Sequence, residues 1–140
     1  MTLNVAQVLE RHFETFVDDH EQWKTLIADD IVWELPFAPS LGHPDKLVGR
    51  DQVLNHVGWF VGAVEDFRFF DLRIQASAES NSAAAQVKAE GVIRHTGKPY
   101  TQEYVLFVSV TDGKLSYIRE YFDPVKAAYA LETPVVMPLS

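Results

Sequence analysis

The segment 119–124, Arg-Glu-Tyr-Phe-Asp-Pro, contains the carboxylate best placed for proton transfer. Side chains alternate between the two faces of a strand, so Glu120 shares a face with Ile118 and Phe122. If Ile118 points toward an apolar interior, burial disfavours the charged form of Glu120 and raises its pKa toward neutral pH. Glu120 is therefore predicted to be a catalytic acid or base. The alternative is a structural ion pair with Lys or Arg of a neighbouring strand.

A histidine is the second candidate for proton transfer. His56 lies on a predicted helix, four residues from both Gln52 and Phe60. If His56 and Glu120 face each other, the two side chains can relay a proton. The alternative is a partly buried histidine that only packs on its helix face.

A charged pair lies on one of the predicted strands. Lys88 and Glu90 are two residues apart and therefore share a strand face. Together with Glu120 they could position a water molecule for hydrolysis. An exposed strand face with alternating charges explains the pair equally simply.

Other kinds of chemistry have no matching pattern. The five histidines, at positions 12, 20, 43, 56 and 95, lack the paired ligand spacing of a zinc helix, and the chain has no cysteine. A glycine-rich phosphate loop and a Gly-x-Ser-x-Gly elbow are also absent from the sequence. We therefore expect no metal and no cofactor.

The first half of the chain is predicted to be mainly helical. Apolar residues recur at three- and four-residue steps from Val5 to Phe16, and a shorter helix follows through residues 23–27. A strand over 31–35 ends at Pro36, and the proline- and glycine-containing segment 37–49 is expected to be loop. Asp51 is the expected N-cap of a third helix.

The second half is predicted to be a strand meander. The expected strands are 67–76, 83–94, 100–110 and 114–122, and the breaks at 95–98 and 111–113 read as hairpins. Asp123 can cap a short helix that starts at Pro124. Helices followed by long antiparallel strands indicate an α+β fold with helices over one sheet face.

The strand 100–110 is apolar on both faces. Tyr104, Leu106, Val108 and Val110 share one face, and Val105, Phe107 and Ser109 share the other. The helices of one chain can cover only one of these faces. We expect the second face, with Arg119 and Tyr121, to contact a partner subunit in a homodimer.

Composition limits the other classes of partner. The 140 residues are 47% hydrophobic, which is enough for one domain spanning 1–140. Twelve basic against twenty acidic residues give a net charge of −8, which argues against nucleic acid and anionic membranes as partners. The segment 1–11 carries charge where a signal peptide is apolar, so we expect a cytoplasmic protein.

Two groups of segments carry a resemblance to a known family: 33–39 ahead of 47–51, and 112–115 ahead of 119–124. They resemble the SnoaL-like branch of the nuclear-transport-factor-2-like superfamily, which includes ketosteroid isomerases, polyketide cyclases, phenazine-biosynthesis A/B proteins and limonene epoxide hydrolases. The resemblance implies a cone-shaped, curved antiparallel sheet covered on its concave face by three N-terminal helices, with a short C-terminal helix. It also implies a mostly apolar cavity and a homodimer through the outer sheet face.

The resemblance also assigns roles to residues. Glu120 matches the catalytic glutamate of the phenazine proteins, and His56 resembles their pocket histidine. Lys88 and Glu90 fall about where the epoxide hydrolases keep an Arg-x-Asp pair. The expected lining consists of Phe16, Trp33, Leu35, Phe60, Lys88, Glu90, Tyr104, Leu106 and Ile118. Its aromatic members would serve equally well as ordinary core.

The catalytic residues of the ketosteroid isomerases are not present at the matching positions of this sequence. Alignment places that family's proton-shuttling aspartate at Leu35, its oxyanion tyrosine at His12 or Phe13, and its second aspartate near Leu106. Leucine neither takes nor gives a proton, so we do not expect that mechanism.

The residues favour a pocket protein for a small hydrophobic molecule, and the resemblance implies that this molecule could be polyketide-like. The leading hypothesis is cofactor-independent isomerase or cyclase chemistry with Glu120 as acid or base. One alternative is a non-catalytic ligand-binding protein, and another is an epoxide hydrolase that uses Lys88, Glu90 and Glu120. The sequence leaves open whether the ligand is turned over.

Overall fold

The computed structural model describes residues 3–77 and 81–137. Three helices come early in the chain: α1 (Val5–Thr15), α2 (His20–Lys24) and α3 (Arg50–Ala63). The strands are β1 (Ile27–Glu34), β2 (Lys46–Val48), β3 (Val64–Ala76), β4 (Ser82–Ile93), β5 (Pro99–Thr111) and β6 (Lys114–Tyr121). A short 3₁₀ helix, η1 (Ala38–Leu41), follows β1, and α4 (Pro124–Leu131) follows β6.

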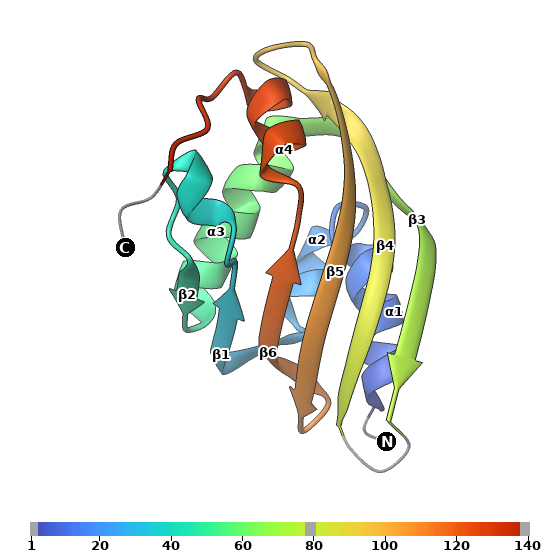
Figure 1. Ribbon diagram of the computed structural model, residues 1–140. Coiled ribbons are helices and arrows are strands. Elements are labelled where there is room, and N and C mark those ends of the chain that lie inside the picture. Colours follow the sequence, from blue (N-terminus) through green and yellow to red (C-terminus); the bar gives the residue numbers. More distant parts are fainter. Residues whose placement is uncertain (1–2, 78–80, 138–140) are drawn as a thin grey trace.

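All six strands form one curved, unclosed sheet in the order β2-β1-β6-β5-β4-β3. The four long strands β3 to β6 make the predicted antiparallel meander. The helices α1, α2 and α3 lie on the concave side of the sheet, and α4 follows β6 at one end of it (Figure 1). The predicted α+β cone is confirmed.

One strand pairing differs from the expected antiparallel sheet. β1 runs parallel to β6, with Trp33 opposite Ile118 and Glu34 opposite Arg119. No hairpin joins these two strands, because α3 and the whole meander separate them in the chain. Their relative direction is therefore set by the long connection rather than by a tight turn.

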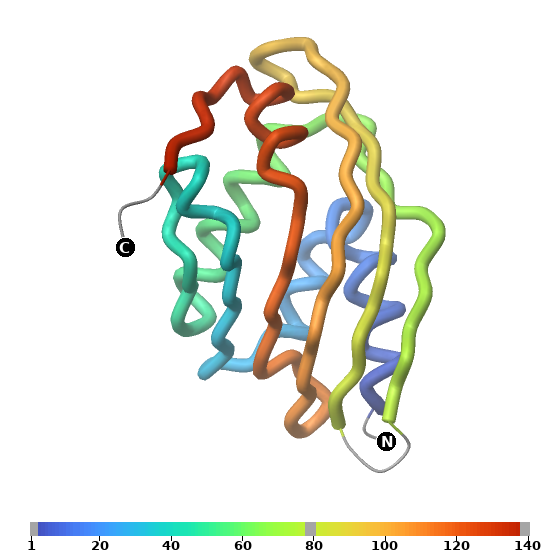
Figure 2. The backbone as a smooth tube through the Cα atoms, viewed as in Figure 1, coloured from blue at the N-terminus to red at the C-terminus, as the bar shows by residue number. Residues whose placement is uncertain are grey.

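The segment 37–49 is more ordered than expected. It contains η1 and the edge strand β2, which pairs with residues 32–34 of β1. The tail of the chain returns beside η1, where the Val136 amide donates to the Ser40 carbonyl at 2.9 Å (Figure 2). The predicted cap at Asp51 is wrong: the N-cap of α3 is Gly49, two residues earlier, and it provides no side-chain hydrogen bond.

Other boundaries shift by only a few residues. Ile27, expected in the second helix, begins β1 because it pairs with Leu115 of β6. The Asp123 cap is confirmed, since its side chain accepts from the amides of Val125 and Lys126. The alternation along β5 is also confirmed: Leu106 and Val108 are buried, and Phe107 is 48% exposed.

A bulge in β3 shapes the wall of the interior. The register between β3 and β4 shifts between Glu65 and Arg68, and Asp66 takes a φ of 54° there. Gly91 of β4 lies beside this bulge, where an added Cβ would be only 3.1 Å from the Phe67 Cα. The missing side chain of Gly91 lets β3 approach closely and directs Phe67 inward.

Replacing Gly91 by alanine should therefore destabilise the fold. The methyl group would press on backbone atoms, which cannot rotate away, and we expect a loss of about 1–3 kcal/mol in the free energy of unfolding. Gly58→Ala in α3 is the matched control, because nothing lies within 4 Å of its added Cβ and alanine favours helix by about 1 kcal/mol. Urea unfolding of both variants measures the difference. Equal stability of the two would contradict the close-approach role of Gly91.

Candidate functional site

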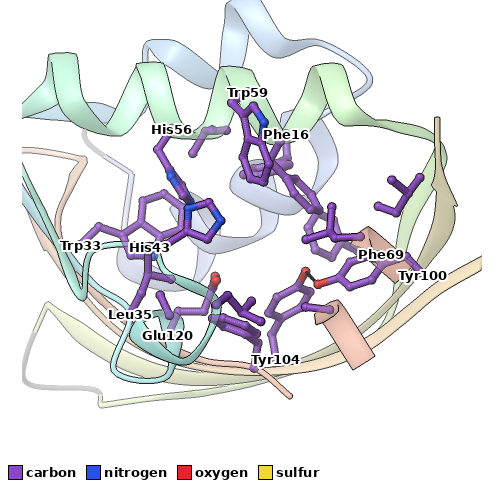
Figure 3. A pocket seen from close by; sticks show the side chains of 18 of the residues that line it. Phe16, Trp33, Leu35, His43, His56, Trp59, Phe69, Tyr100, Tyr104 and Glu120 are labelled. Carbon is purple, nitrogen blue, oxygen red and sulfur yellow. Dashed lines mark hydrogen bonds between the residues drawn. The ribbon is translucent and has the colours of Figure 1, made fainter. Parts of the chain in front are cut away.

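A cavity of about 110 Å³ lies between the concave sheet face and the helices. Five of the predicted pocket residues line it, together with both predicted catalytic residues, and Figure 3 shows most of them. The five are Phe16, Trp33, Leu35, Phe60 and Tyr104. The wall is mainly aromatic and aliphatic, as expected for a site that binds an apolar molecule.

Glu120 projects from β6 into this cavity (Figure 3). Within residues 3–77 and 81–137 it has neither a hydrogen-bond donor nor a counter-ion. Burial without a partner raises its pKa to about 8. Roughly one molecule in ten would then carry the charge at pH 7, so both proton donation and proton acceptance are accessible near neutral pH.

His56 projects from α3 into the same cavity. Burial, and then the nearby His43, lower its pKa below the usual value, so it is mainly neutral near pH 7. The rings of His43 and His56 are 5.9 Å apart, and Trp59 contacts both. No hydrogen bond joins His56 to Glu120 in the described part of the chain. A relay between the two would have to pass through a bound molecule.

His12 is a further cavity residue that sequence reasoning treated only as a lost tyrosine. It is 2% exposed, and Trp23 Nε1 donates to its Nδ1 at 2.9 Å. Burial lowers its pKa to about 3, so the ring is neutral and its proton lies on Nε2. His12 therefore offers an N–H donor and no base.

A pair of tyrosine hydroxyls lies elsewhere on the cavity wall, contributed by β5. The Tyr100 and Tyr104 oxygens are 2.9 Å apart, and the buried Gln102 donates to Tyr100. Burial raises the pKa of Tyr100 to about 12 and raises that of Tyr104 well above its usual value. Tyr100 was missed, although its four-residue spacing from Tyr104 already placed both on one strand face.

Lys88 and Glu90 are not pocket residues, and their expected placement is wrong. They lie on the outer face of β4, because Val87 and Ala89, which alternate with them along the strand, are buried inward. Glu90 pairs with Arg68 at 2.7 Å, and Lys88 is 3.5 Å from Asp71. The water-positioning group expected of an epoxide hydrolase is therefore not assembled.

Two apolar residues were also misplaced. Leu106 and Ile118 face inward but are fully packed in the core, and they do not line the cavity. Trp33 does line it, and its buried Nε1 has no hydrogen-bond acceptor among the described residues. His43 was missed because nothing in its loop sequence indicates that the loop folds over the cavity.

The outer face of β6 carries a polar cluster. Arg119 lies 3.0 Å from Glu34, and Tyr117 also donates to Glu34. The hydrogen bond from Tyr117, and to a smaller extent that from Arg119, lowers the pKa of Glu34. Glu34 is therefore a structural residue of the outer face.

Two kinds of feature are absent over residues 3–77 and 81–137. No helix there is long and apolar enough to cross a membrane. No group of three or more histidine, cysteine or acidic side chains is arranged to hold a metal ion.

Curated relatives align with this chain at low sequence identity. The uncharacterised protein YesE of Bacillus subtilis is 28% identical over 113 residues, which cover 79% of this chain and 76% of YesE. The phenazine biosynthesis protein PhzB1 of Pseudomonas aeruginosa is 22% identical over 130 residues, covering 91% and 80% of the two chains.

Solved structures agree on the fold. A Bacillus subtilis protein proposed to be an isomerase superposes with a TM-score of 0.84 and 23% identity, covering 95% of this chain and 96% of that one. A Xanthomonas campestris protein proposed to be a polyketide cyclase superposes with a TM-score of 0.76 and 17% identity, covering 91% of this chain and 96% of that one. The SnoaL-like domain family matches residues 9–118. The chain therefore belongs to the SnoaL-like family of the nuclear-transport-factor-2-like superfamily.

Proposed function

We propose that the protein carries out cofactor-independent isomerase- or cyclase-type chemistry on a small hydrophobic or polyketide-like compound, with Glu120 as the proton-transfer residue. The observation that carries this proposal is a carboxyl group in an apolar cavity, with a pKa of about 8 and with no partner among the described residues. A structural carboxylate would be expected to have a partner, as Glu34 does on the outer face.

The proposed chemistry begins with an acidic C–H bond next to a carbonyl group. The ionised Glu120 takes this proton, and the electron pair of the C–H bond moves into the enolate. In an isomerisation the same carboxyl returns the proton at another carbon of the conjugated system. In a cyclisation the enolate carbon instead bonds to a second carbonyl carbon, whose oxygen then receives the proton. Both routes balance without an oxidant or reductant.

The relatives point to the same class of chemistry. PhzB1 is a phenazine biosynthesis protein, and one structural neighbour is proposed to be a polyketide cyclase. His56 fits as a second proton-transfer group that acts through the bound molecule, because it lines the cavity and is not hydrogen-bonded to Glu120 in the described part of the chain.

Non-catalytic binding is the second candidate function. The observation in its favour is that Glu120 is not hydrogen-bonded to any other titratable group within the described residues. A single acid in a preformed apolar cavity can hold a ligand without lowering a barrier much. The exchange experiment below separates the two functions.

The outer sheet face is the proposed homodimer surface. Phe107 is 48% exposed there, and Phe37 is 46% exposed. The ring of Tyr121 contacts both, at 6.4 and 5.4 Å between centroids. An exposed aromatic group of this kind is typical of an interface.

The ionisation of Glu120 should be visible in stability. Because folding raises its pKa from an ordinary value of 4.5 to about 8, the folded state binds this proton more tightly than the unfolded state. The contribution to stability is fully present below about pH 4.5 and is lost as pH rises through 8. Glu120→Gln should therefore gain stability relative to wild type between pH 5 and 8, by a few kcal/mol, in urea unfolding. A difference that stays constant with pH would contradict the raised pKa.

Glu120→Gln should also abolish proton exchange. In D₂O, wild type should speed deuterium incorporation at C2 of 1-indanone, with a rate that rises with pH up to about 8 as Glu120 ionises. The variant should be slower by about 100-fold or more. Glu90→Gln is the matched control, because Glu90 lies on the outer face. Exchange as fast in Glu120→Gln as in wild type rules out the acid/base role, and ligand binding without exchange supports the binder.

Phe107→Lys should dissociate the proposed homodimer, because a desolvated lysine would face the partner surface. Val125→Lys is the control, since Val125 on α4 is 65% exposed and lies outside the aromatic group. Sedimentation at several protein concentrations gives the mass. A monomeric wild-type protein, or a dimer unaffected by Phe107→Lys, would show that this face is not the interface.

A further inference from the structure

Gln102 has a fixed orientation between β5 and the end of β6. Its Oε1 accepts from the backbone amides of Glu103 at 3.1 Å and Asp123 at 2.8 Å. Its Nε2 must therefore be the donor, and it donates to the Asp123 carbonyl at 3.0 Å and to the Tyr100 hydroxyl at 3.3 Å. The two backbone donors thus decide which end of the amide faces Tyr100.

With Gln102 in this orientation, the tyrosine pair has one more hydroxyl proton than its own hydrogen bond uses. The Tyr100 oxygen accepts from Gln102, and the bond between the Tyr100 and Tyr104 oxygens uses one of their two hydroxyl protons. The other hydroxyl proton has no acceptor among the described residues. Both tyrosines line the cavity and their joined hydroxyls are drawn there with Glu120 (Figure 3), so the free O–H is available to a bound molecule.

The surroundings select the kind of acceptor. Burial keeps both hydroxyls protonated, and the charge of Glu120 raises the pKa of each further. No lysine or arginine of the described chain lines the cavity, so a buried carboxylate on the ligand would have no counter-ion. A neutral carbonyl oxygen can accept the free proton without that cost.

We propose that the Gln102–Tyr100–Tyr104 chain is a carbonyl-binding element, which donates one hydrogen bond to the ketone or quinone oxygen of the ligand. Gln102 is the positioning residue, because its N–H polarises the hydroxyl pair toward the cavity. The catalytic meaning of this contact rests on the proposed function: the bond would stabilise the enolate while Glu120 exchanges the proton. The binding contact stands by itself and applies equally to a non-catalytic binder.

The test compares 1-indanone with indane, two molecules of nearly equal shape that differ in the carbonyl group. After the dissociation constant of each compound is corrected for its partition from water into cyclohexane, wild type should bind 1-indanone more tightly than indane. The double variant Tyr100→Phe/Tyr104→Phe should reduce the ratio of the two dissociation constants about two- to tenfold, the value of one hydrogen bond. Tyr129→Phe is the control, since Tyr129 is 60% exposed on α4.

Infrared spectroscopy of ¹³C-labelled 1-indanone gives an independent readout. The carbonyl stretch should fall in wild type and return toward its cyclohexane frequency in the double variant. The single variant Tyr100→Phe keeps the Tyr104 hydroxyl but breaks its link to Gln102. It should therefore lose part of the shift of the carbonyl stretch. This single variant carries the test if the double variant does not fold. A ketone that binds no better than indane, or not at all, overturns the proposal, as does an unchanged frequency in these variants.

The outcomes are distinct from those for Glu120. Absence of deuterium exchange in wild type would overturn the acid/base role and leave the ketone preference untouched. Normal exchange with no ketone preference would overturn the carbonyl-binding element alone.

Discussion

The alternation of side chains along β6 is the constraint on which the site depends, because a shift of one residue would turn Glu120 to the outside. The parallel pairing with β1 fixes this register. On the outer face, Arg119 and Tyr117 both bind Glu34 of β1. On the inner face, Ile118 is fully buried opposite Trp33. The outward ion pair and the inward packing thus act together, and they direct the carboxyl of Glu120 into the cavity.

The same alternation explains what could be predicted from sequence and what could not. The two-residue period of a strand placed Glu120 on the same face as Ile118 and placed Arg119 on the opposite face. It also placed Lys88 with Glu90, but it does not say which face is inward. That information lay in Val87 and Ala89, whose burial turns the charges outward. The partners of this pair, Arg68 and Asp71, depend on a bulged strand register that no local pattern encodes.

Long-range pairing accounts for most of the remaining differences. The segment 37–49 has the composition of a loop, yet three of its residues form β2 because the edge of β1 offers them backbone partners. His43 reaches the cavity only through that arrangement. Gln102 is polar within an otherwise apolar strand face, and its burial depends on the backbone of Asp123, which is distant in sequence. Local sequence patterns thus identified the candidate acid, Glu120, whereas most of the hydrogen-bond donors of the cavity are placed by tertiary contacts.

The polar groups of the cavity share one property that follows from their burial. His12 is kept neutral with a pKa of about 3, the tyrosines stay protonated, and Glu120 is mostly uncharged at neutral pH. Each of them can donate a hydrogen bond in this state, whereas only ionised Glu120 is a strong base. A ligand with acceptor oxygens therefore meets donors from α1, β5 and β6, and Glu120 is the cavity acid whose pKa lies close to physiological pH. The proposed function uses this division: the apolar wall holds the molecule, the donors orient it, and Glu120 exchanges the proton, with His56 as the second proton-transfer group.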